Sequence, residues 1–85
     1  MDPKTLYRQG VIAIRDQKDI ARGRELLLEA VQQDPNNDMA WLWLTKTVND
    51  QATRLQYLDR ALQINPQNEQ ARLVKEKLLG GPAAA

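Results

Sequence analysis

Residues 27–42, LLEAVQQDPNNDMAWL, recur 31 positions later as residues 58–73, LDRALQINPQNEQARL. Seven of the sixteen aligned positions are identical, including the alanines Ala30 and Ala61 and the prolines Pro35 and Pro66. A match of this length is far above chance in a chain of 85 residues. Self-similarity at a period of roughly 30–35 residues is typical of helical arrays in which each unit packs on its neighbours. The repeat therefore predicts a helical solenoid.

Proline, glycine and the spacing of apolar residues divide the rest of the chain into helical segments. Asp2-Pro3 has the form of an N-cap followed by proline at the first helical position, and Gly80-Gly81-Pro82 ends the helical pattern. Between these marks the chain is rich in Leu, Ala, Gln, Arg and Glu, and its apolar residues recur at helical spacing. We expect an all-α chain with five helices, at residues 3–17, 20–33, 37–48, 51–64 and 68–79.

These helices are expected to form one domain over residues 1–79. A first repeat occupies about 3–35, a second about 37–66, and a capping helix about 68–79. Residues 80–85 are expected to be a flexible linker or an engineered tail.

The composition argues against catalysis. The chain contains no His, no Cys and no Ser, so it lacks the usual nucleophiles, the histidine base and zinc sites of the Cys/His type. Its eleven Asp and Glu residues are spread along the chain, with no pair in an apolar setting that would tune a carboxylate dyad. We expect no catalytic residues, no cofactor and no metal.

The charge and hydropathy patterns argue against two classes of partner. Twelve Lys and Arg residues nearly cancel the acidic residues, and they are scattered, so no basic patch suits a nucleic acid or an anionic membrane. No apolar stretch is long enough to span a bilayer, and no signal-peptide pattern is present. Together with the absence of Cys, this favours a cytoplasmic protein.

Two longer segments carry a family resemblance. Residues 26–44, LLLEAVQQDPNNDMAWLWL, and 57–75, YLDRALQINPQNEQARLVK, resemble the second helix, the turn and the next first helix of the tetratricopeptide repeat. That family's pattern places an alanine five residues before a proline, as in both copies here. It places an aromatic six residues after the proline and a leucine three further on, matched by Trp41 and Leu44. The small residue that follows is Thr45 in the second repeat and Gly10 in the first.

The resemblance covers residues 5–79. It implies antiparallel helix hairpins stacked as a short right-handed solenoid, with a concave surface that is lined by the first helices and binds peptides. One departure is the spacing from Gly10 to Ala30, 20 residues, against 16 from Thr45 to Ala61. The second hairpin is therefore about one helical turn shorter, and the shortening falls in VNDQATR, residues 48–54. This puts the regular superhelical pitch in doubt, whereas the hairpin architecture stands.

The two tryptophans, Trp41 and Trp43, are two residues apart and point to nearly opposite sides of a helix. Thirty-one residues on, Trp41 corresponds to Arg72 and Trp43 to Val74. The last helix is charged where a further helix would pack, so it reads as a solvent-facing cap, and Leu73 and Val74 are expected to pack backwards. By equivalence, Trp43 packs on the first repeat and Trp41 on its hairpin partner. The alternative is that Trp43 is an exposed binding anchor. The expected core comprises Leu27, Ala30, Trp41, Trp43, Leu44, Leu58 and Ala61.

Carried over position by position, the resemblance also implies a partner-binding surface. The family's carboxylate clamp looks absent, because Tyr7 and Val11 occupy two of its positions. What remains is a mixed groove suited to a helix of a partner protein, with Met and Tyr making adaptable contacts. Val11 and Ile14 have a second interpretation, in which they only seal the end of the first helix pair. The candidate concave residues are Tyr7, Val11, Ile14, Arg15, Met39, Leu42, Lys46 and Asn49.

Two functions remain open at this point. In the first, the chain is a protein–protein interaction module that recruits a peptide or helix of a partner. In the second, it is a structural or oligomerisation module of a larger protein, which docks or forms a homodimer through the first helix and the concave face.

Overall fold

The computed structural model describes residues 1–80. The flexible linker or tail expected at residues 80–85 therefore lies, apart from Gly80, outside the described residues. Residues 1–80 contain five α-helices, one short 3₁₀ helix and no strand. The all-helical prediction and the number of helices are thus confirmed. The helices are α1 (Pro3–Arg15), α2 (Ile20–Gln33), α3 (Asp38–Leu44), α4 (Gln51–Ile64) and α5 (Glu69–Leu78), and the 3₁₀ helix η1 (Thr45–Thr47) continues α3.

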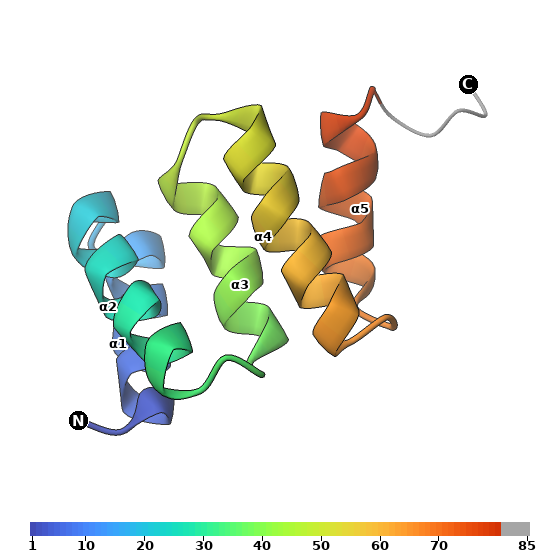
Figure 1. Ribbon diagram of the computed structural model, residues 1–85. Coiled ribbons are helices and arrows are strands. Elements are labelled where there is room, and N and C mark those ends of the chain that lie inside the picture. The colour runs from blue at the N-terminus through green and yellow to red at the C-terminus, as the bar shows by residue number, and fades with distance from the viewer. Residues whose placement is uncertain (81–85) are drawn as a thin grey trace.

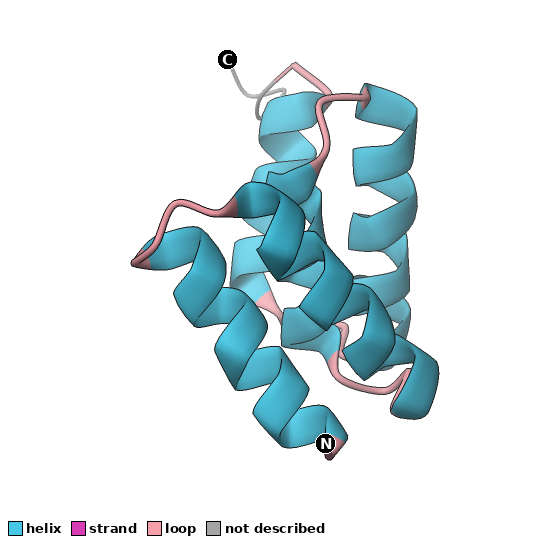
Figure 2. Ribbon diagram, turned by 90° about the vertical axis from the view of Figure 1, so that its left-hand side faces the viewer, coloured by secondary structure: helices cyan, strands magenta, loops and turns pink. Residues whose placement is uncertain are grey.

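Each helix lies beside its neighbour in the chain. Helices α1 and α2 form one antiparallel hairpin, α3 and α4 form a second, and α5 packs on the side of α4 away from the first hairpin (Figure 1). The view from the side of the N-terminal hairpin shows that only short loops join the helices (Figure 2). The backbone is elongated, with extents of 44 × 25 × 19 Å.

The 31-residue repeat corresponds to two turns of closely similar geometry. Asp34 ends α2 with φ −139° and ψ 89°, and Asn65 ends α4 with φ −137° and ψ 91°. Three residues later in each turn an asparagine begins the next helix: the Asn37 side chain accepts from the Ala40 N–H, and the Asn68 side chain from the Ala71 N–H. The shared proline and Asx residues therefore build the same helix–turn–helix connection twice.

One polar contact joins the two turns. The Asp38 carboxylate accepts from the side-chain amides of Asn65, at 3.1 Å, and of Asn68, at 2.8 Å. Asn68 is buried, and this bond together with its cap to Ala71 satisfies its side chain.

The core consists of three apolar clusters that follow the helix order. Leu27 and Leu44, both fully buried, belong to the cluster that joins α1 and α2 to α3. Leu58 and Ala61 belong to the cluster that joins α3, α4 and α5. The first of these clusters comprises Ile14, Leu27, Val31, Ala40 and Leu44, and the second comprises Leu42, Leu58, Ala61 and Ala71. The third cluster lies between α1 and α2 and comprises Leu6, Ala13, Leu26 and Ala30.

Two glycines let α1 and α2 approach closely. A Cβ at Gly10 would lie 2.8 Å from Leu27 Cγ, and a Cβ at Gly23 would lie 2.3 Å from Ile14 Cγ1 and 3.0 Å from the Gly10 carbonyl oxygen. The sequence pattern identified Gly10 as the small residue of the first repeat, whereas it assigned no role to Gly23. Both glycines are buried at the helix crossing.

Two helix ends differ from the prediction by two residues or more. Helix α1 ends at Arg15, two residues early, where the Gln17 N–H and the Asp19 N–H donate to carbonyls of the last turn and Lys18 takes φ 57°. The segment expected as one helix over 37–48 becomes 3₁₀ after Leu44. There the hydroxyls of Thr45 and Thr47 donate to main-chain carbonyls three residues back, which favours a tighter turn.

Candidate interaction groove

Both tryptophans face the sides that the repeat predicts, but neither is fully buried. Trp43 packs on the cluster that contains Ile14 and Leu27, as expected for contact with the first repeat. Trp41 packs on α4, with its ring centroid 5.9 Å from that of Tyr57, and its indole N–H donates to the Pro35 carbonyl at 2.9 Å. Both tryptophans were expected among the core residues, and each has intermediate exposure.

The predicted concave residues divide into buried and accessible ones. Val11, Ile14 and Leu42 are 9, 6 and 3% exposed, so they belong to the core, and this burial favours the interpretation in which Val11 and Ile14 seal the first helix pair. Tyr7 and Met39 are partly buried, and Arg15, Lys46 and Asn49 are exposed. Arg15 forms an ion pair with Asp16, with a distance of 2.9 Å between Nε and the carboxylate.

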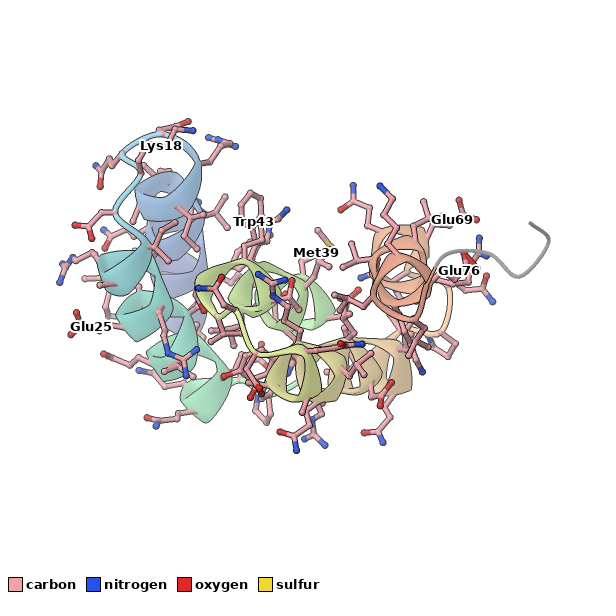
Figure 3. The ribbon with its side chains drawn as sticks, turned by 90° about the horizontal axis from the view of Figure 1, so that it is seen from above. Lys18, Glu25, Met39, Trp43, Glu69 and Glu76 are labelled. Carbon is pink, nitrogen blue, oxygen red and sulfur yellow. The ribbon has the colours of Figure 1, made fainter. Side chains whose placement is uncertain are left out.

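Two partly exposed apolar side chains of α3, Met39 and Trp43, point to the same side of the molecule. Figure 3 shows Met39 and Trp43 rising from α3 toward the space between α1 and α5. Tyr7 of α1 also packs against the cluster that Trp43 contacts. Burial raises the pKa of the Tyr7 hydroxyl, and the nearby negative charge of Asp38 raises it further, so the phenol is neutral at pH 7.

A groove lies between α3 and α5. Its apolar part has a volume of about 330 Å³ and is lined by Leu42, Trp43 and Lys46 from α3 and η1 and by Gln70 and Val74 from α5. Of the apolar lining residues, Leu42 is buried and Trp43 and Val74 are partly exposed, while the polar Gln70 is exposed. The Lys46 ammonium lies over the Trp43 ring, 5.4 Å from its centroid, so it holds a positive charge beside the apolar part.

A second hollow continues the groove toward α4. It has a volume of about 200 Å³ and is lined by Thr45, Lys46, Arg54, Val74 and Leu78, so it shares Lys46 and Val74 with the apolar part. The Arg54 side chain is held in place, because its Nε donates to the Val48 carbonyl at 2.7 Å. The remaining guanidinium donors keep the charge available at this end. We refer to the two hollows together as the α3–α5 groove.

The repeat itself contained the signal for the α5 wall. Shifted by 31 residues, the concave positions Met39, Leu42 and Lys46 fall on Gln70, Leu73 and Lys77. Leu73, which was expected to pack backwards, is 48% exposed, and that prediction was wrong. Val74 does pack on the cluster that contains Leu58. The sequence-based interpretation treated α5 only as a cap, so it missed Gln70, Val74 and Arg54 as groove residues.

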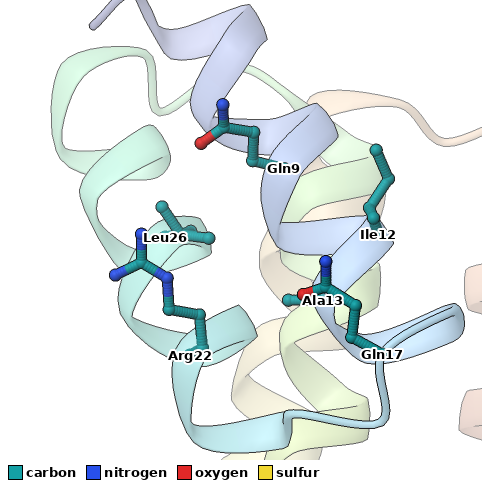
Figure 4. Close-up of a pocket in the computed structure, with 6 residues that line it drawn as sticks. All are labelled: Gln9, Ile12, Ala13, Gln17, Arg22 and Leu26. Atoms are coloured by element: carbon teal, nitrogen blue, oxygen red, sulfur yellow. The ribbon is translucent and has the colours of Figure 1, made fainter.

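A separate hollow lies between α1 and α2, on the side away from α3 (Figure 4). It has a volume of about 320 Å³, and its floor is formed by the buried residues Ala13 and Leu26. Its rim carries Arg22 and the amide side chains Gln9 and Gln17, together with the partly buried Ile12.

Within residues 1–80, no helix combines the length and the apolar character that crossing a bilayer requires. A scan against protein-family models and a search of curated proteins both returned no match, so the resemblance to a repeat family rests on the residues of this chain.

Proposed function

We propose that this chain is a non-catalytic protein–protein interaction module whose α3–α5 groove holds a peptide or a helix of a partner protein. The observation that carries the proposal is the groove itself, in which the partly exposed Trp43 faces Val74 across a hollow of about 330 Å³. A partly exposed tryptophan beside an apolar hollow is the kind of anchor that dominates binding energy in protein interfaces. The residue inventory supports a non-catalytic role, since the chain offers no His, Cys or Ser.

The architecture that we propose is a short right-handed solenoid of the tetratricopeptide type, with α5 as its capping helix. Three features support it: the two similar turns at Pro35 and Pro66, the packing of each helix on its chain neighbour, and small residues at the helix crossings. In such an array the first helix of each pair lines the concave side. The α3–α5 groove lies between two helices of this kind.

A peptide-display selection tests the proposed function. A random peptide library is panned on the wild-type chain, and the enriched peptides are measured by fluorescence anisotropy. Gln70→Tyr places a bulky ring at the exposed edge of the groove, and Gln63→Tyr makes the same change at an exposed site of α4 that does not line the groove. We expect peptides whose affinity falls about tenfold or more on Gln70→Tyr and is unchanged on Gln63→Tyr. Enrichment of peptides that bind both variants equally, or of none, would contradict the proposal.

The alternative function is a structural or oligomerisation role, which a different observation favours. Leu73 and Leu79 of the last helical segment are 48 and 60% exposed, and no further helix covers them within residues 1–80. A second copy or another part of a larger protein could cover such a surface. Light scattering coupled to size exclusion decides the homodimer: a dimer at micromolar concentration that Leu73→Gln converts to a monomer supports it, and a monomer at that concentration excludes it.

A further inference from the structure

The lining of the α3–α5 groove is biased in charge. The eight residues that line its two hollows include the cations Lys46 and Arg54 and no acidic residue. The chain as a whole is nearly neutral, with twelve basic and eleven acidic residues. The acids closest to the groove along α5 are engaged elsewhere, because Glu69 and Glu76 both pair with Arg72. The lining of the groove therefore contains two cationic side chains and no carboxylate.

The charge is also unevenly placed along the groove. The part between Trp43 and Gln70 is apolar, and the part between Arg54 and Leu78 has both cations at its edge. Lys46 and Val74 belong to both parts, so the apolar hollow and the cationic hollow are adjoining. Lys77 is exposed, and it follows Val74 by three residues on α5, which places it on the same side of that helix.

The two cations differ in how firmly they are held. Arg54 is fixed by its bond to the Val48 carbonyl, and a second nitrogen lies 3.4 Å from the Asn49 side-chain oxygen. Lys46 makes no hydrogen bond or ion pair among the described residues, and its contact is the Trp43 ring. A partner carboxylate that enters the cationic hollow meets a positioned guanidinium and a mobile ammonium, and both can donate charge-assisted hydrogen bonds.

From this arrangement we propose that the partner is an acidic segment, in which an apolar side chain fills the hollow beside Trp43 and the carboxylate of a neighbouring Asp or Glu side chain binds Lys46 and Arg54. The inference rests on the proposed function, because it assigns the chemistry of the segment that the groove holds. Electrostatic complementarity of this kind selects partners and their orientation more than it adds affinity.

The test uses the same peptide library and first separates the groove binders. Peptides that lose affinity on Gln70→Tyr and keep it on Gln63→Tyr are sequenced, and their Asp and Glu content is compared with that of the input library. They are then synthesised with both ends capped, so that side chains carry the only charges. Binding is measured on the wild type, on Lys46→Met, and on Lys18→Asn. Lys18→Asn removes one positive charge from the α1–α2 loop, away from the groove (Figure 3), and Asn tolerates the positive φ there.

We expect the groove-dependent peptides to be enriched in Asp and Glu. Lys46→Met should weaken them about three- to fivefold at low salt, with less effect at high salt, and Lys18→Asn should leave them unchanged. A second selection on Lys46→Glu should lose the acidic preference. Circular dichroism melts establish that the variants are folded. Because Lys46 is exposed, its substitution should disturb the fold little.

Each outcome separates the two proposals. Groove-dependent peptides without acidic enrichment, or with affinities that Lys46→Met leaves unchanged, overturn the acidic partner and keep the interaction function. Acidic peptides that bind Gln70→Tyr and the wild type with equal affinity bind outside the groove, and this result would also overturn the proposal of an acidic partner. A selection that yields no groove-dependent peptide overturns the proposed function, and the acidic partner falls with it.

Discussion

At the scale of single residues, the close approach of α1 and α2 depends on a glycine that the repeat pattern does not mark. Gly23 of α2 faces Ile14 and the backbone of Gly10 on α1, so three residues from two helices share one small space. Gly10 could be predicted because the resembled family has a small residue at that position. Gly23 could not, because a glycine inside a helical segment also occurs with no packing role, and only the crossing of the helices reveals the reason for it.

The contact at Gly23 leads to the first prediction, for Gly23→Ala. Alanine favours the helix by about 1 kcal/mol over glycine, but its Cβ would lie 2.3 Å from Ile14 Cγ1 and 3.0 Å from a carbonyl oxygen. Overpacking of a helix crossing costs about 1–3 kcal/mol. Because backbone as well as side chain must shift, we expect the overpacking to win and the free energy of unfolding to fall by about 1–2 kcal/mol, measured by urea denaturation.

A double-mutant cycle provides the control for this prediction. In an Ile14→Ala background the nearest clashing atom is absent, so Gly23→Ala should cost less than it does in the wild type. Equal costs in the two backgrounds, or a stabilising Gly23→Ala, would show that the helices are not held as closely as the structure indicates.

At the scale of helices and turns, the starts of all five α-helices follow from side chains that the sequence displays. Asp2, Asp19, Asn37, Asp50 and Asn68 each accept from a main-chain N–H of the first turn. Such caps are readable from residue type and position, although only Asp2 was identified as a cap from the sequence, and the predicted starts lie within one residue of the observed ones. The ends were less predictable. Nothing in the spacing of apolar residues reveals that two threonine hydroxyls will convert the end of the third helix to 3₁₀.

The cap of α4 gives the second prediction, which concerns pH. Hydrogen bonds from the Thr53 hydroxyl, at 2.6 Å, and from its N–H, at 2.8 Å, lower the pKa of Asp50 below 3.8. Since the folded-state pKa is depressed, the ionised cap stabilises the fold above the unfolded-state value, and this contribution is lost as the pH falls through the folded-state value. Asp50→Asn keeps a capping side chain that does not titrate.

Thermal melts between about pH 6 and pH 2.5 test this. We expect the wild type to lose more stability than Asp50→Asn on acidification, so that the two melting temperatures converge at low pH. Glu29→Gln removes an exposed carboxylate that caps no helix and serves as the control. A melting curve of Asp50→Asn that is as pH-dependent as that of the wild type would be evidence against the cap.

The packing of α4 between α3 and α5 gives the third prediction, for Ala61→Leu. Ala61 is fully buried in the cluster that contains Leu42, Leu58 and Ala71. A leucine there must displace at least one of these neighbours, at a cost of about 1–3 kcal/mol. Ala52→Leu makes the same change at an exposed site of the same helix and should be nearly neutral. Denaturation of both variants compares them directly, and a neutral Ala61→Leu would mean that α4 and its neighbours are not in close contact.

At the scale of the whole molecule, the repeat predicted the helix order but not the groove. Ala30 and Ala61, which were expected in the core, are 2 and 0% exposed, and the equally buried pair Ala40 and Ala71 was not among the expected core residues. The groove depends instead on how much of Trp43, Leu73 and Val74 remains accessible after packing. Sequence identity at a repeat position fixes which side a residue faces, whereas its exposure depends on the size and tilt of the neighbouring helices. Leu42 and Leu73 illustrate this, because they are equivalent in the repeat and differ from 3 to 48% in exposure.

The same difference in packing bears on how stability is distributed along the molecule. Helix α2 has five buried residues and has neighbours on both sides, α1 and α3. Helix α5 contributes one buried residue, Ala71, and has α4 as its main neighbour. Its further attachments include the partial burial of Val74 and Leu78, the Gln51 amide that donates to the Leu78 carbonyl, and the ion pair of Lys75 with Asp59 at 2.8 Å, besides the bond of its N-cap Asn68 to Asp38.

We therefore predict that α5 opens without the rest of the molecule. In native-state hydrogen exchange, the amides of α5 should exchange through an opening of lower free energy than those of α2, which should exchange only on global unfolding. Lys75→Gln removes an ion pair between partly exposed side chains, worth about 0.5 kcal/mol, and should lower the opening free energy of α5 while that of α1 shifts less.

Because α5 forms one wall of the α3–α5 groove, a partner bound there should slow hydrogen exchange in α5 more than in the other helices. Identical opening free energies in α2 and α5 would instead make the chain one cooperative unit, in which the groove cannot open separately.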